Sequence, residues 1–178
     1  WSSRVMAPSS LVFYLGIKGR MKDVLHHNLF FDADFKIHSE EIYTSKKWPT
    51  DPLFYMSAPS MTDDSVAPDG HENLFILIPI APDLEDNEAI REHYFSRVLE
   101  RIKMITGEDL QDRIVYKRSY CVKDFKADYH SFQGNAYGLA NTLRQTAFMK
   151  PKMKSRKLDN LYFTGQLTVP GPGIPPAL

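Results

Sequence analysis

The sequence contains a single cysteine, Cys121, in 178 residues. One thiol cannot close an internal disulfide or provide a cysteine-based zinc site, and so low a count is typical of a reducing compartment. Apolar runs are also short: the longest covers residues 74–78 and is followed by Pro79. A helix that crosses a membrane needs ~20 apolar residues, so we expect none in this chain.

An excess of charge of one sign is also lacking. The 22 Lys and Arg residues balance 22 Asp and Glu residues, which gives a formal net charge of zero. A nucleic-acid-binding protein usually carries a basic surplus or a basic stripe, so nucleic acid is not an expected partner. The densest basic run, residues 150–157, alternates with Pro and Met, and we interpret it as a solvated connector.

Spacings typical of metal ligands are absent as well. His26 and His27 precede Asp32 and Asp34, but these four fit no helical i, i+4 arrangement, so no metal is expected. The Asp residues within 62–72 resemble the paired acids of glycosidases, but we interpret this stretch as a turn rich in Asp. That stretch includes Pro-Asp-Gly, which predicts a turn because Pro presets φ and Gly accepts a positive φ.

Hydrophobic patterns predict an α+β fold, with a mixed or antiparallel sheet and a covering helical layer. The clearest helix is residues 87–105, where Ile90 begins an apolar stripe that recurs every fourth residue. We expect Asp86 to cap this helix and Gly107 to end it. A shorter helix is expected at residues 34–43. Strands are predicted at residues 10–17, 28–31, 53–58, 74–78 and 114–122.

The C-terminal stretch, residues 161–178, has a composition suited to binding chemistry. Residues 161–164 predict a short buried strand, and a loop containing Gly171 and Gly173 then leads to Pro175, which suits the first turn of a helix. A glycine loop before a helix N-terminus exposes N–H groups to an electron-rich ligand, and a reduced flavin is one such ligand. The alternative is a Pro/Gly turn that only redirects the chain.

This stretch resembles the C-terminal flavin motif of the bacterial and fungal phytoene desaturase family, where a strand ending in Gly leads to Pro-Gly-x-Gly-[Ile/Val]-Pro. The resemblance continues upstream, in order, through a T-D-x-S-x-A-P-x-G block at residues 62–70. Many members have a His before the first Pro of the loop, and this chain has Val169 there, so we assign no histidine role. The other matching positions are Asp124-Phe125, Gly134, Tyr137-Gly138, Gln145 and the segment from Phe148 to Pro151.

The resemblance implies an FAD enzyme that desaturates a carotenoid precursor such as phytoene, with a hydride passing to flavin N5 and a proton leaving the adjacent carbon. A quinone or another acceptor would reoxidise the flavin. Residues 1–158 would then be mostly a substrate-binding domain of the FAD-dependent, amine-oxidase-like type, and residues 159–178 a return to the FAD-binding domain that stops before its helix. No catalytic residue is assigned. The implied cofactor-binding residues are Gly165, Gln166, Pro170, Gly171, Gly173, Ile174 and Pro175.

Tyr14, Tyr137 and Phe148 are candidates to line a polyene channel, although each is equally explained as a core aromatic. The G-x-G-x-x-G fingerprint of a dinucleotide-binding unit does not occur in the sequence, so the chain alone is expected to be inactive. We expect the complete protein to be cytoplasmic and peripheral to the membrane. The alternatives are a related FAD carotenoid or retinoid saturase, a carotenoid oxidase, or a polyene- or lipid-binding module without activity.

Overall fold

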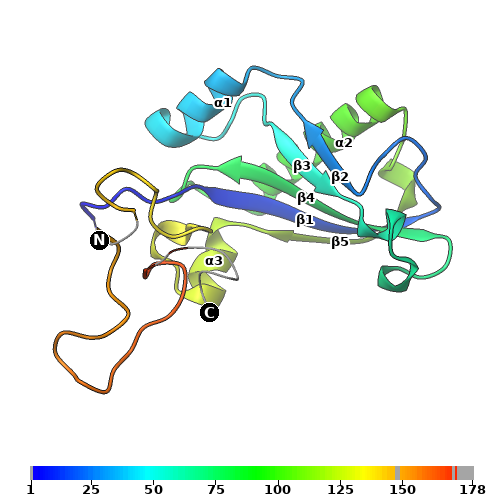
Figure 1. The fold of residues 1–178 in the computed structure, drawn as a ribbon. Helices are drawn as coiled ribbons and strands as arrows, with labels where there is room; N and C mark the ends of the chain where they lie inside the picture. Colours follow the sequence, from blue (N-terminus) through cyan, green and yellow to red (C-terminus); the bar gives the residue numbers. More distant parts are fainter. Residues whose placement is uncertain (1, 147–148, 170, 172–178) are drawn as a thin grey trace.

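The centre of the molecule is a five-stranded antiparallel sheet with the strand order β2-β3-β4-β1-β5 (Figure 1). The structure is a computed structural model, and it describes residues 2–146, 149–169 and 171. The expected α+β class with an antiparallel sheet is therefore confirmed. The strands are β1 (Ser9–Lys18), β2 (His27–Phe30), β3 (Phe54–Ser57), β4 (His71–Ile80) and β5 (Ile114–Tyr120).

Strand β4 is longer than predicted at both ends: it begins at His71, and Pro79 does not end it. Pro79 pairs with Ser10 of β1, but the pairing of β4 with β3 stops at Leu77. The side of Pro79 that lacks an N–H therefore lies beyond the end of β3, where no ladder bond is lost. The expected turn before β4 is present, with Gly70 at φ +70° and His71 N bonded to the Pro68 carbonyl.

Helix α2 (Glu88–Thr106) is the long predicted helix, and Gly107 ends it in the left-handed conformation at φ +74°. Its N-cap is Asn87, whose side chain accepts from Ile90 N, and not Asp86 as predicted. Asp86 instead binds Arg91. Helix α1 (Phe35–Glu40) continues as a π-helical turn (Glu41–Ser45), and helix α3 (Val122–Tyr129) was not predicted. Short 3-10 turns are Pro59–Met61, Asp64–Val66, Gln111–Arg113 and Phe132–Gly134.

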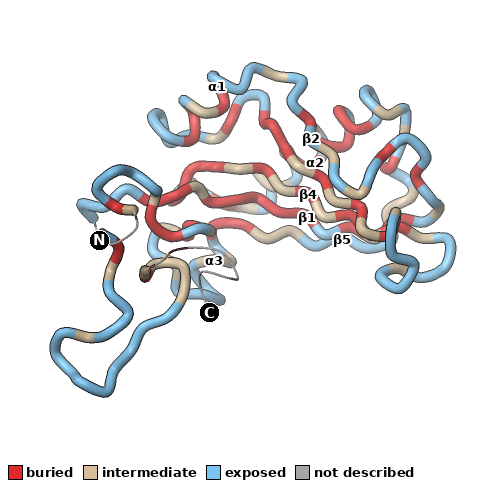
Figure 2. Tube along the Cα trace, viewed as in Figure 1, coloured by how far each residue is buried: buried red, intermediate tan, exposed pale blue. Residues whose placement is uncertain are grey.

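The main core lies between α2 and one face of the sheet (Figure 2). The rings of Phe13 on β1 and Phe95 on α2 lie 5.0 Å apart, and Val98 and Ile102 are fully buried. Burial of each such side chain contributes roughly 1.5–3 kcal/mol, so this face anchors the fold. Helix α2 covers one side of the sheet. The other side is covered only in part, by α3, whose Phe125 ring lies 4.9 Å from Tyr120 of β5, and by α1 at the edge of the sheet.

The predicted buried strand at residues 161–164 is wrong for the described chain. Residues 151–169 form an extended arm that leaves the body of the molecule and returns (Figure 1). The only β-pairing within the arm is an isolated antiparallel bridge between Lys154 and Tyr162, and Leu161, Tyr162 and Phe163 are exposed. No sheet in the described residues lies beside this segment, so it has no surface against which to be buried.

Candidate cofactor and substrate site

The N-terminal residues 5–9 organise the motif-bearing segment 134–145. The side-chain amide of Gln145 donates to the Val5 carbonyl and its oxygen accepts from Val5 N, at 2.8 and 3.0 Å. Ala7 N donates to the Gly138 carbonyl at 2.8 Å. Gln145 is buried and its hydrogen-bonding groups are occupied by backbone, so its role in the motif is to fix this segment.

Two motif glycines are required by close packing. A β-carbon on Gly134 would stand 2.6 Å from the Val122 carbonyl oxygen, and the residue has φ +60°. A β-carbon on Gly138, at φ +82°, would stand 3.1 Å from the Gln166 carbonyl oxygen. Only glycine combines a positive φ with so close a contact at the β-carbon position. The contact at Gly138 places the Gly165–Gln166 turn against the body of the molecule.

The same close approach occurs between Lys150 and Gly171. Val169 N donates to the Pro151 carbonyl at 3.0 Å, which lays the start of the predicted flavin loop beside the start of the basic run. Gly171 is buried at φ +127°, and a β-carbon there would meet Lys150 Cε at 3.0 Å and Nζ at 3.7 Å. The Lys150 side chain thus lies directly against the glycine that the sequence assigns to the cofactor.

The interpretation of residues 150–157 as a solvated connector is wrong for Lys150. This residue is 3% exposed, whereas Lys152, Lys154 and Lys157 are exposed. Within the described part of the chain, Lys150 Nζ is the side-chain atom that is buried without a hydrogen-bond partner. Buried ammonium groups normally have partners, so Lys150 is an unusual cation among the described residues.

Three of the predicted cofactor residues, Gly165, Gln166 and Gly171, therefore lie on one stretch of chain that packs against residues 138 and 150. The Gly165 turn is closed by Thr168, whose N–H and hydroxyl both donate to the Gly165 carbonyl. The remaining cofactor residues predicted from the sequence, Pro170, Gly173, Ile174 and Pro175, lie outside the described residues. Phe148, predicted to line the substrate channel, also lies outside them.

The sheet face turned away from α2 carries a continuous apolar row. The strand register aligns, across the whole sheet, Leu29, Tyr55, Leu77, Val12 and Tyr120. The next row holds Phe75 and Tyr14, whose rings lie 5.5 Å apart, and Tyr14 is 43% exposed. Tyr14 therefore lies on this open face, while Tyr137, 42% exposed, adjoins Gly138 near the start of β1.

Two grooves open onto this face. The first, about 250 Å³, lies between α1 and the edge of the sheet and is almost entirely apolar. The second, about 630 Å³, is lined by Tyr14, Phe75 and Tyr116 on the sheet and by Pro68 of the loop at residues 59–70. The first groove is apolar, whereas the lining of the second also includes His71, Glu72 and Asn73. The apolar surface that the two grooves share suits a long hydrocarbon better than a compact polar ligand. The first groove is lined chiefly by Pro8, Leu29, Phe31, Phe35, Ile42, Tyr43, Leu53, Tyr55 and Pro79.

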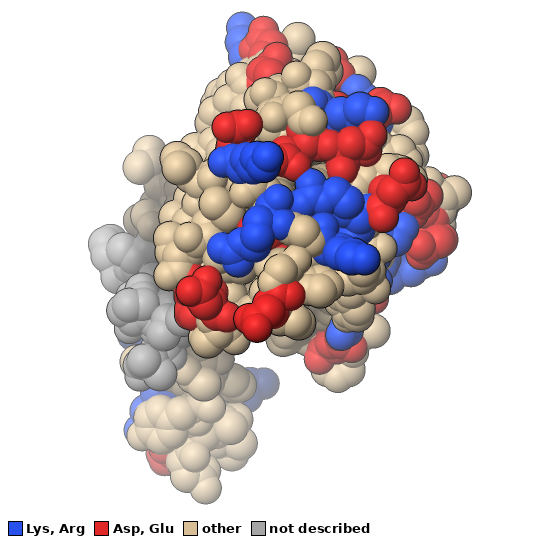
Figure 3. All heavy atoms as spheres, turned by 90° about the vertical axis from the view of Figure 1, so that its right-hand side faces the viewer, with Lys and Arg blue, Asp and Glu red and all other residues tan. Residues whose placement is uncertain are grey.

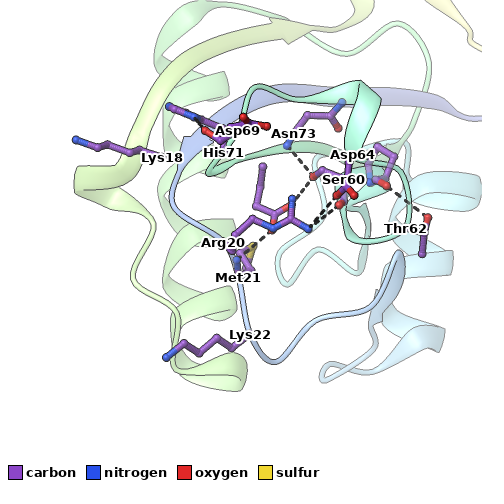
Figure 4. Close-up of polar contacts among 12 residues, drawn as sticks. Lys18, Arg20, Met21, Lys22, Ser60, Thr62, Asp64, Asp69, His71 and Asn73 are labelled. Carbon is purple, nitrogen blue, oxygen red and sulfur yellow. Dashed lines mark hydrogen bonds and ion pairs between the residues drawn. The ribbon is translucent and has the colours of Figure 1, made fainter.

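The acidic loop at residues 59–70 is held by an ion pair between the buried Glu72 and the partly exposed Arg20, and it is not arranged as a pair of catalytic acids. Glu72 is 1% exposed, and its carboxylate accepts from Arg20 Nε at 3.0 Å and from the Ser60 hydroxyl. Figure 4 shows Arg20 reaching from its loop toward Ser60 and Asp64. Asp63 caps its own turn, and hydrogen bonds from Ser65 lower the pKa of its carboxyl.

The charged groups outside this site are largely neutralised by one another. Figure 3 shows basic and acidic side chains interspersed over one end of the molecule. Arg113 pairs with Glu108 at 2.5 Å, and Lys103 pairs with Asp109 at 2.6 Å. Among the described residues no group of three or more His, Cys, Asp or Glu side chains is placed to hold a metal ion. In the same part of the chain, no helix combines the length and apolar character needed to cross a bilayer.

Comparison with curated proteins finds relatives along the whole chain, and several of them are named as desaturases of carotenoids or carotenoid precursors. The chain belongs to the carotenoid desaturase family. It is 47% identical over 178 residues to the carotenoid 3,4-desaturase of Haloarcula japonica, covering all of this chain and 36% of that protein. It is 32% identical over 176 residues to the zeta-carotene-forming phytoene desaturase of Myxococcus xanthus, covering 96% of this chain and 33% of the relative.

A relative named for a different activity is as similar to this chain as the Myxococcus xanthus protein is. The 4,4'-diapolycopen-4-al dehydrogenase of Metabacillus indicus is 32% identical over 167 residues, covering 94% of this chain and 34% of that protein. No protein-family model matches the chain. The chain spans about a third of the length of these curated relatives.

Proposed function

We propose that the full-length protein is an FAD-dependent carotenoid desaturase and that this chain forms its substrate-binding part. The observation that carries the reaction class is the similarity to a carotenoid 3,4-desaturase over all 178 residues. That identity, 47% against 32% to the phytoene desaturase, favours a carotenoid that is already conjugated over phytoene as the substrate. FAD, when bound, supplies an acceptor for the hydride that leaves the polyene.

The residues of the flavin loop fit this cofactor. Gly171 has no side chain and a positive φ, and the Lys150 ammonium beside it lacks a partner among the described residues. An electron-rich ring system satisfies both features, because it needs close backbone approach and accepts a hydrogen bond from a cation. We assign the loop beginning at Gly165 and Gln166 to the flavin, together with Pro170, Gly173, Ile174 and Pro175 of the sequence motif.

The proposed division of the chain is a substrate domain over residues 1–158 and a return to the FAD-binding domain over residues 159–178. The exposed apolar side chains of the arm support this division. Leu161 and Phe163 are 37% and 49% exposed, and an apolar segment of this kind is stable only when another part of the protein covers it. The dinucleotide fingerprint that is missing from this chain belongs to that covering domain.

The polyene is proposed to lie across the open face of the sheet. The two grooves, together with Tyr14 on β1 and Phe75 on β4, provide a largely apolar path along several strands. Tyr137, near the start of β1, is proposed to line the end of the path closer to the flavin loop, since its neighbour Gly138 contacts Gln166. Such substrates partition into bilayers, so the protein is proposed to be cytoplasmic and to meet the membrane surface peripherally. A quinone or similar acceptor would reoxidise the flavin.

A carotenoid oxidase is the second candidate, because a relative named as a diapolycopenal dehydrogenase is as similar as the phytoene desaturase. Purified full-length protein should be incubated separately with phytoene, with an acyclic conjugated carotenoid and with a carotenoid aldehyde. Desaturation is shown by a product that is two hydrogens lighter and absorbs at longer wavelength. Conversion of the aldehyde alone to a carboxylic acid favours the oxidase, and a bound but unchanged carotenoid favours a binding module.

A further inference from the structure

The Lys150 ammonium occupies an unusual position for a cation. It is buried beside Gly171, 3% exposed, and is the side-chain polar atom left without a partner in the described residues. Two arginines whose side chains are 11% exposed are both paired: Arg91 binds Asp86, and Arg101 binds Asp32. Lys150 therefore differs from these arginines in having no hydrogen-bond partner among the described residues.

An unpaired buried ammonium destabilises a folded protein, because transfer of the charge out of water is not compensated. The three N–H donors of a lysine all require acceptors, and an anionic acceptor provides the strongest hydrogen bonds. Lys150 Nζ stands 3.7 Å from the point that a β-carbon on Gly171 would occupy. A group that approaches the Gly171 backbone is thus within reach of the ammonium.

We propose that Lys150 binds the electron-rich edge of the flavin ring, around N1 and the C2 carbonyl, and stabilises the reduced cofactor over the oxidised one. This inference rests on the proposed function, since it requires that the loop at Gly171 meets the flavin. A flavin that takes up a hydride gains two electrons and one proton, and so gains one negative charge. The adjacent carbon then loses a proton to solvent, and the electron pair of that C–H bond forms the new double bond.

The pyrophosphate of FAD is the competing acceptor, and the sequence argues against it. Pyrophosphate groups of dinucleotides bind at the glycine fingerprint that opens a helix, and this chain has no such fingerprint. The loop next to Lys150 has instead the Pro and Gly composition that was assigned to the ring. The two acceptors differ in one measurable respect: the charge of the pyrophosphate does not change when the flavin is reduced.

The test is the midpoint potential of the bound flavin in full-length holoprotein, with Lys150→Met as the variant. Methionine keeps much of the lysine stem and removes the charge. We expect reduced FAD to lose at least about tenfold more affinity than oxidised FAD, as for a lost charged hydrogen bond. For a two-electron couple that difference lowers the midpoint potential by about 30 mV.

Two further variants make the result specific. Lys152→Met removes the same charge from an exposed position two residues away and should leave the potential unchanged. Lys150→Arg keeps the charge and should retain most of the wild-type potential. If Lys150→Met does not fold, Lys150→Gln replaces it, with the same fall in potential expected because the charge is again absent.

A second readout does not involve the redox state. Removal of an unpaired buried charge should raise the thermal stability of the deflavinated Lys150→Met protein above that of deflavinated wild type, while FAD should stabilise the variant less.

An unchanged potential in Lys150→Met, with flavin bound, would overturn the assignment to the ring. Equal losses of oxidised and reduced FAD affinity would also overturn it and would indicate the pyrophosphate. A full-length wild-type protein that contains no flavin would refute the proposed function itself, which is a separate outcome.

Discussion

The roles of several motif residues follow from single contacts. Gly134 is glycine because a β-carbon would overlap the Val122 carbonyl oxygen at 2.6 Å, and its own carbonyl accepts from the Ser9 hydroxyl. Gly138 leaves room for the Gln166 carbonyl, and the Gln145 side-chain amide forms two hydrogen bonds with the backbone of Val5. These residues join the start of the chain to residues 134–145 and to the turn at Gly165, so they hold these segments of the chain together.

Gly134→Ala should therefore destabilise the full-length protein by about 3 kcal/mol or more, from overlap with backbone added to the cost of a positive φ. Gly70→Ala is the matched control, because Gly70 also has a positive φ but nothing within 4 Å of the β-carbon position. Its expected cost is only about 1–2 kcal/mol. Thermal unfolding monitored by circular dichroism compares the two variants. Equal losses of stability would show that the contact with Val122 has no energetic importance.

Cys121 should be chemically inert in the folded protein. The residue is fully buried, and burial raises the pKa of its thiol to about 12, so the reactive thiolate is scarce near neutral pH. A chain comprising these residues should react with a thiol reagent slowly under native conditions and quickly in denaturant. Mass spectrometry of the labelled protein locates the modified residue. Rapid native labelling of Cys121 would contradict the packing described for the start of α3.

At the scale of elements, a buried ionic network joins α2, α3 and β5. Arg91 on α2 donates to Asp86 at 2.7 Å through two nitrogens, to Asp124 at 2.7 Å and to the Ser119 hydroxyl at 3.2 Å. Asp86 also accepts from Lys123 N at 2.8 Å. The network therefore fixes the position of α3, from which the chain continues into the motif segment at residue 134.

The network should give the protein an acid-dependent stability. Burial would raise the pKa of Asp86, but hydrogen bonds from Arg91 and Lys123 outweigh burial and hold that pKa below its usual value. A carboxyl with a depressed folded pKa stabilises the fold above its unfolded pKa of about 3.9, and the stabilisation is lost as the pH falls through the folded pKa. Asp86→Asn should thus differ most from wild type above about pH 4, with the difference shrinking in stronger acid.

Thermal unfolding of wild type and Asp86→Asn across a pH series measures this difference. Glu92→Gln is a suitable control, because Glu92 is an exposed residue whose pairing with Lys117 lies on the protein surface. A stability difference between wild type and Asp86→Asn that stays constant from neutral to strongly acidic pH would contradict the role given to the carboxylate.

The elements that could be predicted from sequence are those with a strong pattern of their own. The apolar run of β1 indicates a buried strand, and the four-residue apolar repeat of α2 indicates a helix with one buried face. Both elements were predicted within a few residues of their ends. Helix α3 was missed because it is short and buries only Val122, which leaves no apolar stripe to detect. The N-cap of α2 was misplaced by one residue, since both Asp86 and Asn87 are good caps and only the contact with Arg91 separates them.

The candidate site was predictable only in part. The glycine loop is recognisable from composition, but the burial of Lys150 depends on Val169 and Gly171 lying beside it, some twenty residues later in the chain. Local composition gives Lys150 the same appearance as the exposed lysines that follow it. The arm at residues 151–169 was expected to contain a buried strand, because its apolar residues suit a sheet that the described chain does not include.

At the scale of the whole molecule, the proposed function makes the chain one of two halves of a cofactor site. The residues proposed to meet the flavin are in this chain, whereas the fingerprint for the pyrophosphate is absent from the sequence. The isolated 178-residue chain should therefore show no saturable quenching of FAD fluorescence at micromolar concentrations, while the full-length protein should retain flavin on purification. Tight, stoichiometric binding of FAD by the isolated chain would show that the pyrophosphate site lies within it.

The most direct test of the central claim, flavin-dependent desaturation of a carotenoid, is a single anaerobic turnover of the full-length protein. The purified enzyme is mixed without oxygen or quinone with an acyclic conjugated carotenoid in liposomes, and one absorbance record follows cofactor and substrate together. The account predicts that the visible band of the oxidised flavin bleaches in step with a red shift of the carotenoid spectrum, with one double bond formed per flavin. A carotenoid that binds and leaves the flavin fully oxidised, or a product formed without flavin reduction, would contradict it.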